Sequence, residues 1–114
     1  YTLAKMGMSF VPLGLAAEFA RAGIAINALW PRPVIATDPL RMTPGADEPV
    51  AVNPEIVADA AHAILVKPAR EATGRFFIDE EVLRENGVDD FDHYAVQAGH
   101  PLLPDLFLDS QQAS

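Results

Sequence analysis

The 114-residue sequence contains no cysteine, so it has no disulfide framework, no thiolate nucleophile and no cysteine ligand for a metal. Basic residues are also scarce, with eight Lys and Arg against sixteen Asp and Glu, for a net charge of −8. Nucleic acids and anionic membranes are bound by clustered basic side chains, so we expect neither as a partner. The lack of cysteine is compatible with the cytoplasm, which is the location we expect.

Long apolar runs and targeting signals are missing too. No uninterrupted apolar run approaches the ~20 residues of a membrane-spanning helix, so we expect no membrane span. The chain begins without a basic leader or a cleavage site, which argues against a signal peptide. Its histidines, His62, His93 and His100, form no His-Glu-x-x-His motif and no close pair, so we interpret them as surface residues and expect no metal site.

The first 20 residues carry the most informative pattern. Apolar residues recur there at alternating steps of three and four, which predicts a helix, and Gly23 is well placed to end it. Tyr1 and Lys5 stand four apart at its start and would project from one face. An ammonium near a phenol lowers the phenol's pKa from its usual ~10 toward the working range of an acid–base catalyst. A lone Tyr-x-x-x-Lys is more often an interfacial tyrosine and a surface lysine.

The remaining elements predict an α/β fold. Residues 24–30 form a short apolar run between Gly23 and Pro31 and read as a fully buried strand. Asn53-Pro54-Glu55 is typical of a helix start, with Asn53 as the capping side chain. Residues 75–79 predict a second strand and residues 80–86 a small helix that Asp79 could cap.

Between these strands lies a proline-rich connection. Five prolines occur from residue 31 to 53, and no helical or strand period runs through them. A connection this long is either a lid over a ligand site or a disordered linker, and a lid is favoured because it leaves the end of a buried strand. The acidic and aromatic tail from Val88 onward ends in apolar residues that we expect to dock on another surface.

The order of these motifs resembles the short-chain dehydrogenase/reductase family. Tyr-x-x-x-Lys opens a helix that ends at a glycine, the next strand carries Asn27, and then come Pro31 and Ile35-Ala36-Thr37. The resemblance covers most of the chain and roughly the second half of a family domain. Residues 28–32 and 77–84 are most similar to the branch that contains hydroxysteroid dehydrogenase-like and citronellol-type dehydrogenases.

The resemblance implies roles for five residues. Tyr1 would be the general acid/base, and Lys5 would lower its pKa and hold the nicotinamide ribose of NAD or NADP. Pro31, Ile35 and Thr37 would line the nicotinamide end of the cofactor. The sequence departs from the family pattern in two places. Arg32 replaces the glycine that normally follows the proline, and the interval from Asn27 to Thr37 is one residue longer than in the family pattern.

The implied fold is the C-terminal part of a doubly wound parallel-sheet (Rossmann-type) domain, with residues 1–114 as the C-terminal half of a single, incomplete domain. The glycine-rich fingerprint that binds a dinucleotide's pyrophosphate is absent from the sequence. The complete protein is expected to transfer hydride between NAD(P) and a small hydrophobic alcohol or carbonyl substrate, as a homo-oligomer, whereas the isolated chain should be inactive. The alternative is a truncated non-catalytic remnant or interaction module.

Overall fold

The structure, a computed structural model, describes residues 2–33, 35–37 and 52–96. These residues form a mixed helix and strand arrangement with a small parallel sheet, which confirms the expected α/β class. Its elements in chain order are α1 (Thr2–Ala20), β1 (Ala28–Trp30), α3 (Glu55–Leu65), β2 (Phe76–Ile78), α4 (Asp79–Glu85) and the 3-10 helix η2 (Asp92–Tyr94).

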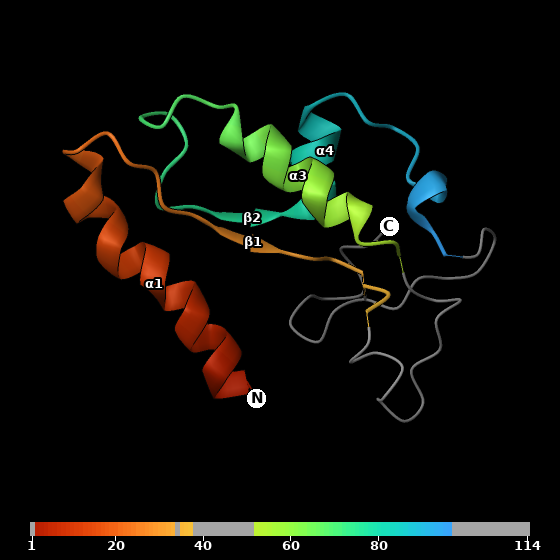
Figure 1. Ribbon diagram of the computed structural model, residues 1–114, viewed down its shortest axis with the longest axis horizontal. Coiled ribbons are helices and arrows are strands. Elements are labelled where there is room, and N and C mark those ends of the chain that lie inside the picture. The colour runs from red at the N-terminus through yellow and green to blue at the C-terminus, as the bar shows by residue number, and fades with distance from the viewer. Residues whose placement is uncertain (1, 34, 38–51, 97–114) are drawn as a thin grey trace.

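The two strands pair in parallel and separate two layers of helices (Figure 1). Ala28 pairs with Phe76 and Trp30 with Ile78, so the carboxyl ends of both strands meet at one edge. Phe77 points to the side covered by α3 and α4 and is buried there, while Phe76 lies on the opposite side and stacks on Trp30. In Figure 1, α1 lies on the far side of the sheet from α3.

The strand expected at residues 24–30 is shorter and less buried than its apolar sequence predicted. Only Ala28–Trp30 is strand, its residues are half-buried, and Ile24 is 49% exposed. Before the strand begins, Ile26 N–H donates to Thr73 Oγ1 (3.1 Å) and its carbonyl accepts from Gly74 N–H (2.8 Å). At Ile26 a bond to a side chain thus replaces one of the backbone hydrogen bonds of a regular parallel sheet, and the strand begins only at Ala28.

The hydrophobic core lies between α3, β2, α4 and η2. The apolar stripe predicted along α3 is confirmed, with Ile56 and Ala60 fully buried. The expected Asn53 cap is wrong: the helix begins after Pro54 with no side-chain capping bond. Instead, the backbone carbonyl of Asn53 accepts from Ile56 N–H (3.3 Å) at the start of the helix. The N–H of Asn53 donates to Tyr94 O (2.7 Å) and joins this end to η2. The buried core members are Val52, Ile56, Ala60, Ala72, Phe77, Val82, Leu83 and Tyr94.

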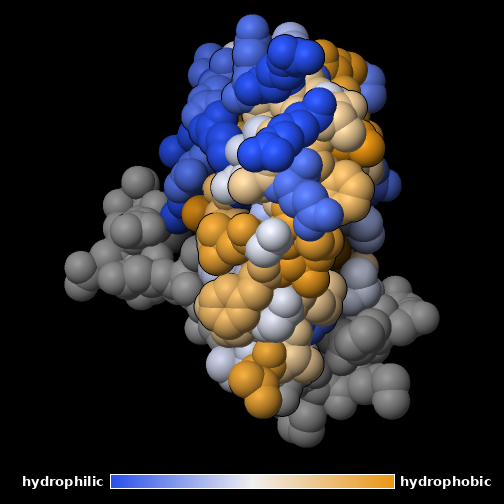
Figure 2. Space-filling model, turned by 90° about the vertical axis from the view of Figure 1, so that its left-hand side faces the viewer, coloured by the Kyte–Doolittle hydropathy of each residue, from blue (hydrophilic) through white to orange (hydrophobic). Residues whose placement is uncertain are grey.

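Helix α1 runs without a break through Pro12 and buries only Ser9, Pro12 and Ala16. The structure places Gly23 just beyond it with φ +74°, as the glycine-ended helix predicted. Leu3 is 86% exposed and Leu13 58%, and Figure 2, which views the α1 side of the molecule, shows hydrophobic side chains gathered over much of this face.

This helix of 19 residues, with a mean hydropathy of 1.2 over its most apolar 18-residue stretch, also meets the length and composition of a membrane-spanning helix. We expected no membrane span because no uninterrupted apolar run is long enough. The mean hydropathy of the helix, in contrast, stays high although Lys5 and Glu18 lie within it. The core helix of a soluble protein meets the same criterion, so this finding is weak evidence for a membrane span.

Candidate functional site

The structure describes four of the five residues expected at the site. Tyr1 lies outside the described residues, as do most of the proline-rich connection expected to be a lid and the tail beyond Val96. Lys5 is exposed near the start of α1, Pro31 follows β1 directly, and Ile35 and Thr37 come shortly after it. The site can therefore be built from Lys5 and from the residues at the carboxyl end of β1.

A pair of hydrogen bonds fastens the Lys5 turn of α1 to the end of β1. Trp30 Nε1 donates to Ser9 Oγ (2.9 Å), and Ser9 Oγ donates to Lys5 O (3.5 Å), one helical turn earlier. The Trp30 ring is held in turn by stacking on Phe76, with 5.9 Å between ring centroids. Trp30 immediately precedes Pro31, so the structure brings two of the expected site residues to one edge of the sheet. Sequence analysis missed Ser9, whose signal was a small polar residue one turn from Lys5.

Ile35 and Thr37 follow on a segment anchored to the core. Ile35 forms an isolated parallel bridge with Val52, in which Ala36 N–H donates to Val52 O (2.8 Å). Val52 is only 1% exposed, so the bridge ties this segment to the most buried part of the molecule. Ile35 is half-buried against the core and Thr37 is exposed. Their roles toward a cofactor stay predictions.

Arg32, the residue that departs from the family pattern, is buried and held by three acidic residues. Its N–H donates to Asp79 Oδ1 (2.9 Å), its Nη2 donates to Glu81 Oε1 (2.6 Å), and its Nε lies 3.4 Å from Glu80 Oε2. Helix α4 begins at Asp79 itself, one residue before the predicted start, with Ile78 in the capping position. These contacts span 47 to 49 residues of sequence, which no local pattern could reveal.

The buried carboxyl group of Asp79 is electrostatically unusual. Burial raises its pKa from 3.8 to about 6, although the N–H groups of Arg32 and Glu80 favour the charged form. Oδ1 accepts both of these N–H groups, whereas Oδ2 is buried without a hydrogen-bond partner. Such a group at the end of two parallel strands is a candidate for a functional role.

The second tyrosine of the chain is a structural residue. Tyr94 is 5% exposed and its hydroxyl donates to Asp59 Oδ2 (2.5 Å). Burial, followed by the hydrogen bond to Asp59, raises its pKa to about 12, so it stays protonated at neutral pH. This is the opposite of what an acid–base tyrosine requires. In the described part of the chain, no three His, Asp or Glu side chains are arranged to hold a metal.

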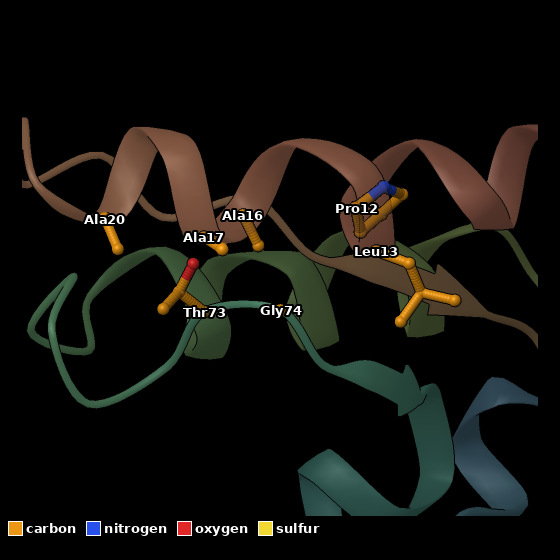
Figure 3. Close-up of a pocket in the computed structure, with 7 residues that line it drawn as sticks. All are labelled: Pro12, Leu13, Ala16, Ala17, Ala20, Thr73 and Gly74. Atoms are coloured by element: carbon orange, nitrogen blue, oxygen red, sulfur yellow. The ribbon is translucent and has the colours of Figure 1, made fainter.

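A hollow of about 290 Å³ lies between α1 and the turn before β2 (Figure 3). It carries no titratable side chain, and Gly74 places it at the amino end of β2, opposite the edge where Pro31 and Asp79 lie. It is therefore separate from the candidate site. Its lining residues are Pro12, Leu13, Ala16, Ala17, Ala20, Thr73 and Gly74.

Curated relatives match almost the whole chain, although no protein-family model matches it. Hydroxysteroid dehydrogenase-like protein 2 of Danio rerio is 52% identical over 112 residues, which cover 97% of this chain and 26% of that protein. The protein of the same name from Rattus norvegicus is 53% identical over 110 residues, covering 96% and 21%. The chain thus spans about a quarter of the length of these relatives.

Two solved structures match the chain in three dimensions. A putative dehydrogenase from Xanthomonas campestris superimposes with a TM-score of 0.90 at 60% identity, and a short-chain dehydrogenase from Mycobacterium thermoresistibile with 0.85 at 43%. Each match covers 96% of this chain and 40% of the other. Together with the curated relatives, these matches confirm the resemblance to short-chain dehydrogenases and to the hydroxysteroid dehydrogenase-like branch.

Proposed function

We propose that this chain, which is similar to short-chain dehydrogenases along 96% of its length, is the catalytic-helix and substrate-loop half of an NAD(P)-dependent oxidoreductase. Residues 1–114 would be the C-terminal half of one doubly wound parallel-sheet domain. The complete protein would transfer hydride between the cofactor and a small hydrophobic alcohol or carbonyl compound. The dehydrogenase names of its relatives support the reaction class.

One observation carries the proposal: the Lys5 turn of α1 is fastened through Ser9 to Trp30, at the carboxyl end of β1. Ligands of open α/β sheets bind outside this edge. Tyr1, four residues before Lys5, would exchange a proton with the substrate oxygen. The ammonium of Lys5 would keep the phenol's pKa within the working range and would donate to the nicotinamide ribose.

The described residues fit the nicotinamide end of a cofactor. Pro31 and the segment from Ile35 to Thr37 leave the same strand end, and the bridge to Val52 holds that segment in place. The exposed hydroxyl of Thr37 can donate to or accept from a polar ligand group. The bound cofactor would supply or accept the hydride. Its pyrophosphate would be held elsewhere, because no glycine-rich fingerprint occurs in these 114 residues.

We also propose that the complete protein is a cytoplasmic homo-oligomer with no nucleic-acid partner and no membrane span. The net charge of −8 supports the exclusion of nucleic acid. The exposed apolar face of α1 supports burial against further protein, either the rest of the domain or a second copy.

The test uses the complete protein with Tyr1→Phe and Lys5→Met variants. Tyr1→Phe keeps the ring but removes the proton, so turnover should fall roughly 10²- to 10⁴-fold while the cofactor Kd stays the same. Lys5→Met should damage both turnover and cofactor binding. Lys67→Met, which changes the chain's other lysine, is the matched control and should change neither. A Tyr1→Phe enzyme with near-normal kcat contradicts the proposal.

The second candidate function is a non-catalytic interaction module, and the apolar surface of α1 favours it. Leu3, Met8 and Phe10 are between 56% and 86% exposed, which suits a docking surface. The coding sequence upstream of Tyr1 separates the two candidates. A strand, a Gly-x-x-x-Gly-x-Gly turn and a serine before Tyr1 support the enzyme, whereas a stop codon or an unrelated domain supports the module.

A further inference from the structure

The carboxyl ends of β1 and β2 are joined by a group of four residues that the proposed chemistry does not use. Trp30 pairs with Ile78, so the residues that follow, Pro31 with Arg32 and then Asp79, lie next to each other. We call Arg32, Asp79, Glu80 and Glu81 the strand-end clamp. It lies at the edge where the cofactor's nicotinamide end is proposed to bind.

Asp79 makes the central contact of the clamp. Its Oδ1 accepts the N–H of Arg32 (2.9 Å) and the N–H of Glu80 (2.8 Å). A single oxygen atom therefore connects the backbone leaving β1 to the first turn of α4. Asp79 is 0% exposed, so water does not compete for these bonds.

The Arg32 side chain closes the clamp from the other direction. Its guanidinium reaches back to Glu81 (2.6 Å) and Glu80 (3.4 Å) on α4, and its side chain is only 6% exposed. Since Arg32 follows Pro31 directly, these contacts fix the backbone next to one expected cofactor-lining residue. Arg84 also lies 3.7 Å from Glu80 and completes the charged surroundings.

The clamp is an unfavourable way merely to begin a short helix. Exposed Asp, Ser or Thr caps a helix without desolvation, whereas here a carboxylate is fully buried and its Oδ2 has no hydrogen-bond partner. Burial accordingly raises the pKa of Asp79 to about 6. Its geometry suits another task, which is to hold the exit of β1 at a fixed distance from α4.

We propose that Asp79 is a positioning residue of the oxidoreductase, which holds Pro31 and Arg32, at the exit of β1, in the cofactor-binding position. The inference rests on the proposed function. Asp79 is not a member of the proposed acid–base pair, so its loss should weaken cofactor binding more than the chemical step.

The test compares Asp79→Ala and Asp79→Asn in the complete protein, with NADH and NADPH titrated by fluorescence. Asp79→Ala removes both hydrogen bonds and should raise the cofactor Kd and KM about 10-fold, with kcat changed less than 3-fold. Asp79→Asn keeps an oxygen where Oδ1 stands, so its Kd should stay within about 3-fold of the parent. Asp89→Ala, which changes an exposed acid before η2, is the control and should leave Kd unchanged.

A folded Asp79→Ala protein with the parent's Kd overturns the inference and leaves the proposed function standing. If Asp79→Ala does not fold, Asp79→Ser decides, because its shorter side chain moves the acceptor away from the N–H of Arg32 while it keeps a hydroxyl group at the start of α4. A folded Asp79→Ser protein should have a Kd raised several-fold, and an unchanged Kd overturns the inference. A parent protein that binds neither NADH nor NADPH overturns the proposed function itself and the inference with it.

Discussion

The unit built from α3, β2, α4 and η2 and the helix α1 are both rich in apolar residues, but only the first holds large apolar side chains that are fully buried, although Leu65 and Phe76 are exposed there too. Ile56 of α3 is 1% exposed, whereas Leu3 and Leu13 of α1 are 86% and 58% exposed. Helix α1 touches the rest of the molecule through small residues, Ser9 and Ala16, and through Pro12. Apolar periodicity therefore predicted both helices, but it could not predict what covers them.

The lengths of the matched structures offer a physical reason for this difference in burial. The chain corresponds to 40% of each solved dehydrogenase chain that it matches. If the proposed function holds, the open apolar face of α1 is the surface on which further protein would pack. The packed unit, in contrast, already has a core of its own around Ile56, Phe77 and Val82. The two regions should respond differently to the same kind of substitution.

The largest expected effect comes from Ile56→Ala, compared with Leu13→Ala. Truncating buried Ile56 should cost roughly 2–5 kcal/mol of unfolding free energy in the complete protein. Leu13→Ala should also cost about 2 kcal/mol or more there if further protein covers α1, but less than about 0.5 kcal/mol if Leu13 faces water. Urea denaturation of both variants measures this. A harmless Leu13→Ala in the complete protein would break the interpretation of α1 as a covered helix.

The second effect is a pH dependence that belongs to the packed unit alone. Because burial raises the pKa of Asp79 from 3.8 to about 6, the folded state binds its proton more tightly than the unfolded state. The stability contributed by this group is therefore complete below pH 3.8 and is lost as the pH rises through 6. The difference corresponds to ~3 kcal/mol, at 1.36 kcal/mol for each pKa unit.

Asp79→Asn removes this ionisation. Measured against the parent by urea denaturation from pH 4 to pH 7, the variant should gain relative stability as the pH rises. Asp89→Asn, at an exposed position, should follow the parent at every pH. A parent and Asp79→Asn variant that run in parallel across this range would show that burial does not disturb Asp79.

The sequence alone predicted the main helices and strands, but it did not predict the contacts between them. The period of three and four predicted α1, Gly23 ended it, and the stripe from Ile56 predicted α3, because these signals are local. The strand at 24–30 was overestimated, since an apolar run does not reveal that Thr73 bonds to Ile26 in place of a ladder.

The same limit applies to the candidate site, where residues could be predicted but the contacts between them could not. Lys5 and Pro31 were expected from the order of motifs, but the Ser9–Trp30 bond that joins them spans 21 residues. The clamp could be predicted even less, because Arg32 and Asp79 are 47 residues apart and arginine is a residue type that is mostly exposed. Burying charged groups depends on pairing across the sheet, which no periodicity records.

The smallest effect concerns the joint between the two regions, where Gly74 meets α1. Gly74 has φ +68°, and a Cβ placed on it would lie 3.2 Å from Ala16 Cβ. Gly23 has a similar φ of +74°, with nothing within 4 Å of an added Cβ. Alanine at either site should cost roughly 1–2 kcal/mol for the left-handed conformation, but only Gly74→Ala should add about 1 kcal/mol for crowding against α1.

Comparing the two variants by thermal and urea denaturation of the complete protein isolates that crowding from the backbone strain. Ala16→Gly introduced beside Gly74→Ala removes the methyl group that is crowded, so the double variant should recover the additional loss after the cost of glycine in a helix is subtracted. Equal costs for Gly74→Ala and Gly23→Ala would mean that α1 moves aside freely. In that case Ala16 would not restrain the turn, and the Ser9–Trp30 bond would still join α1 to the end of β1.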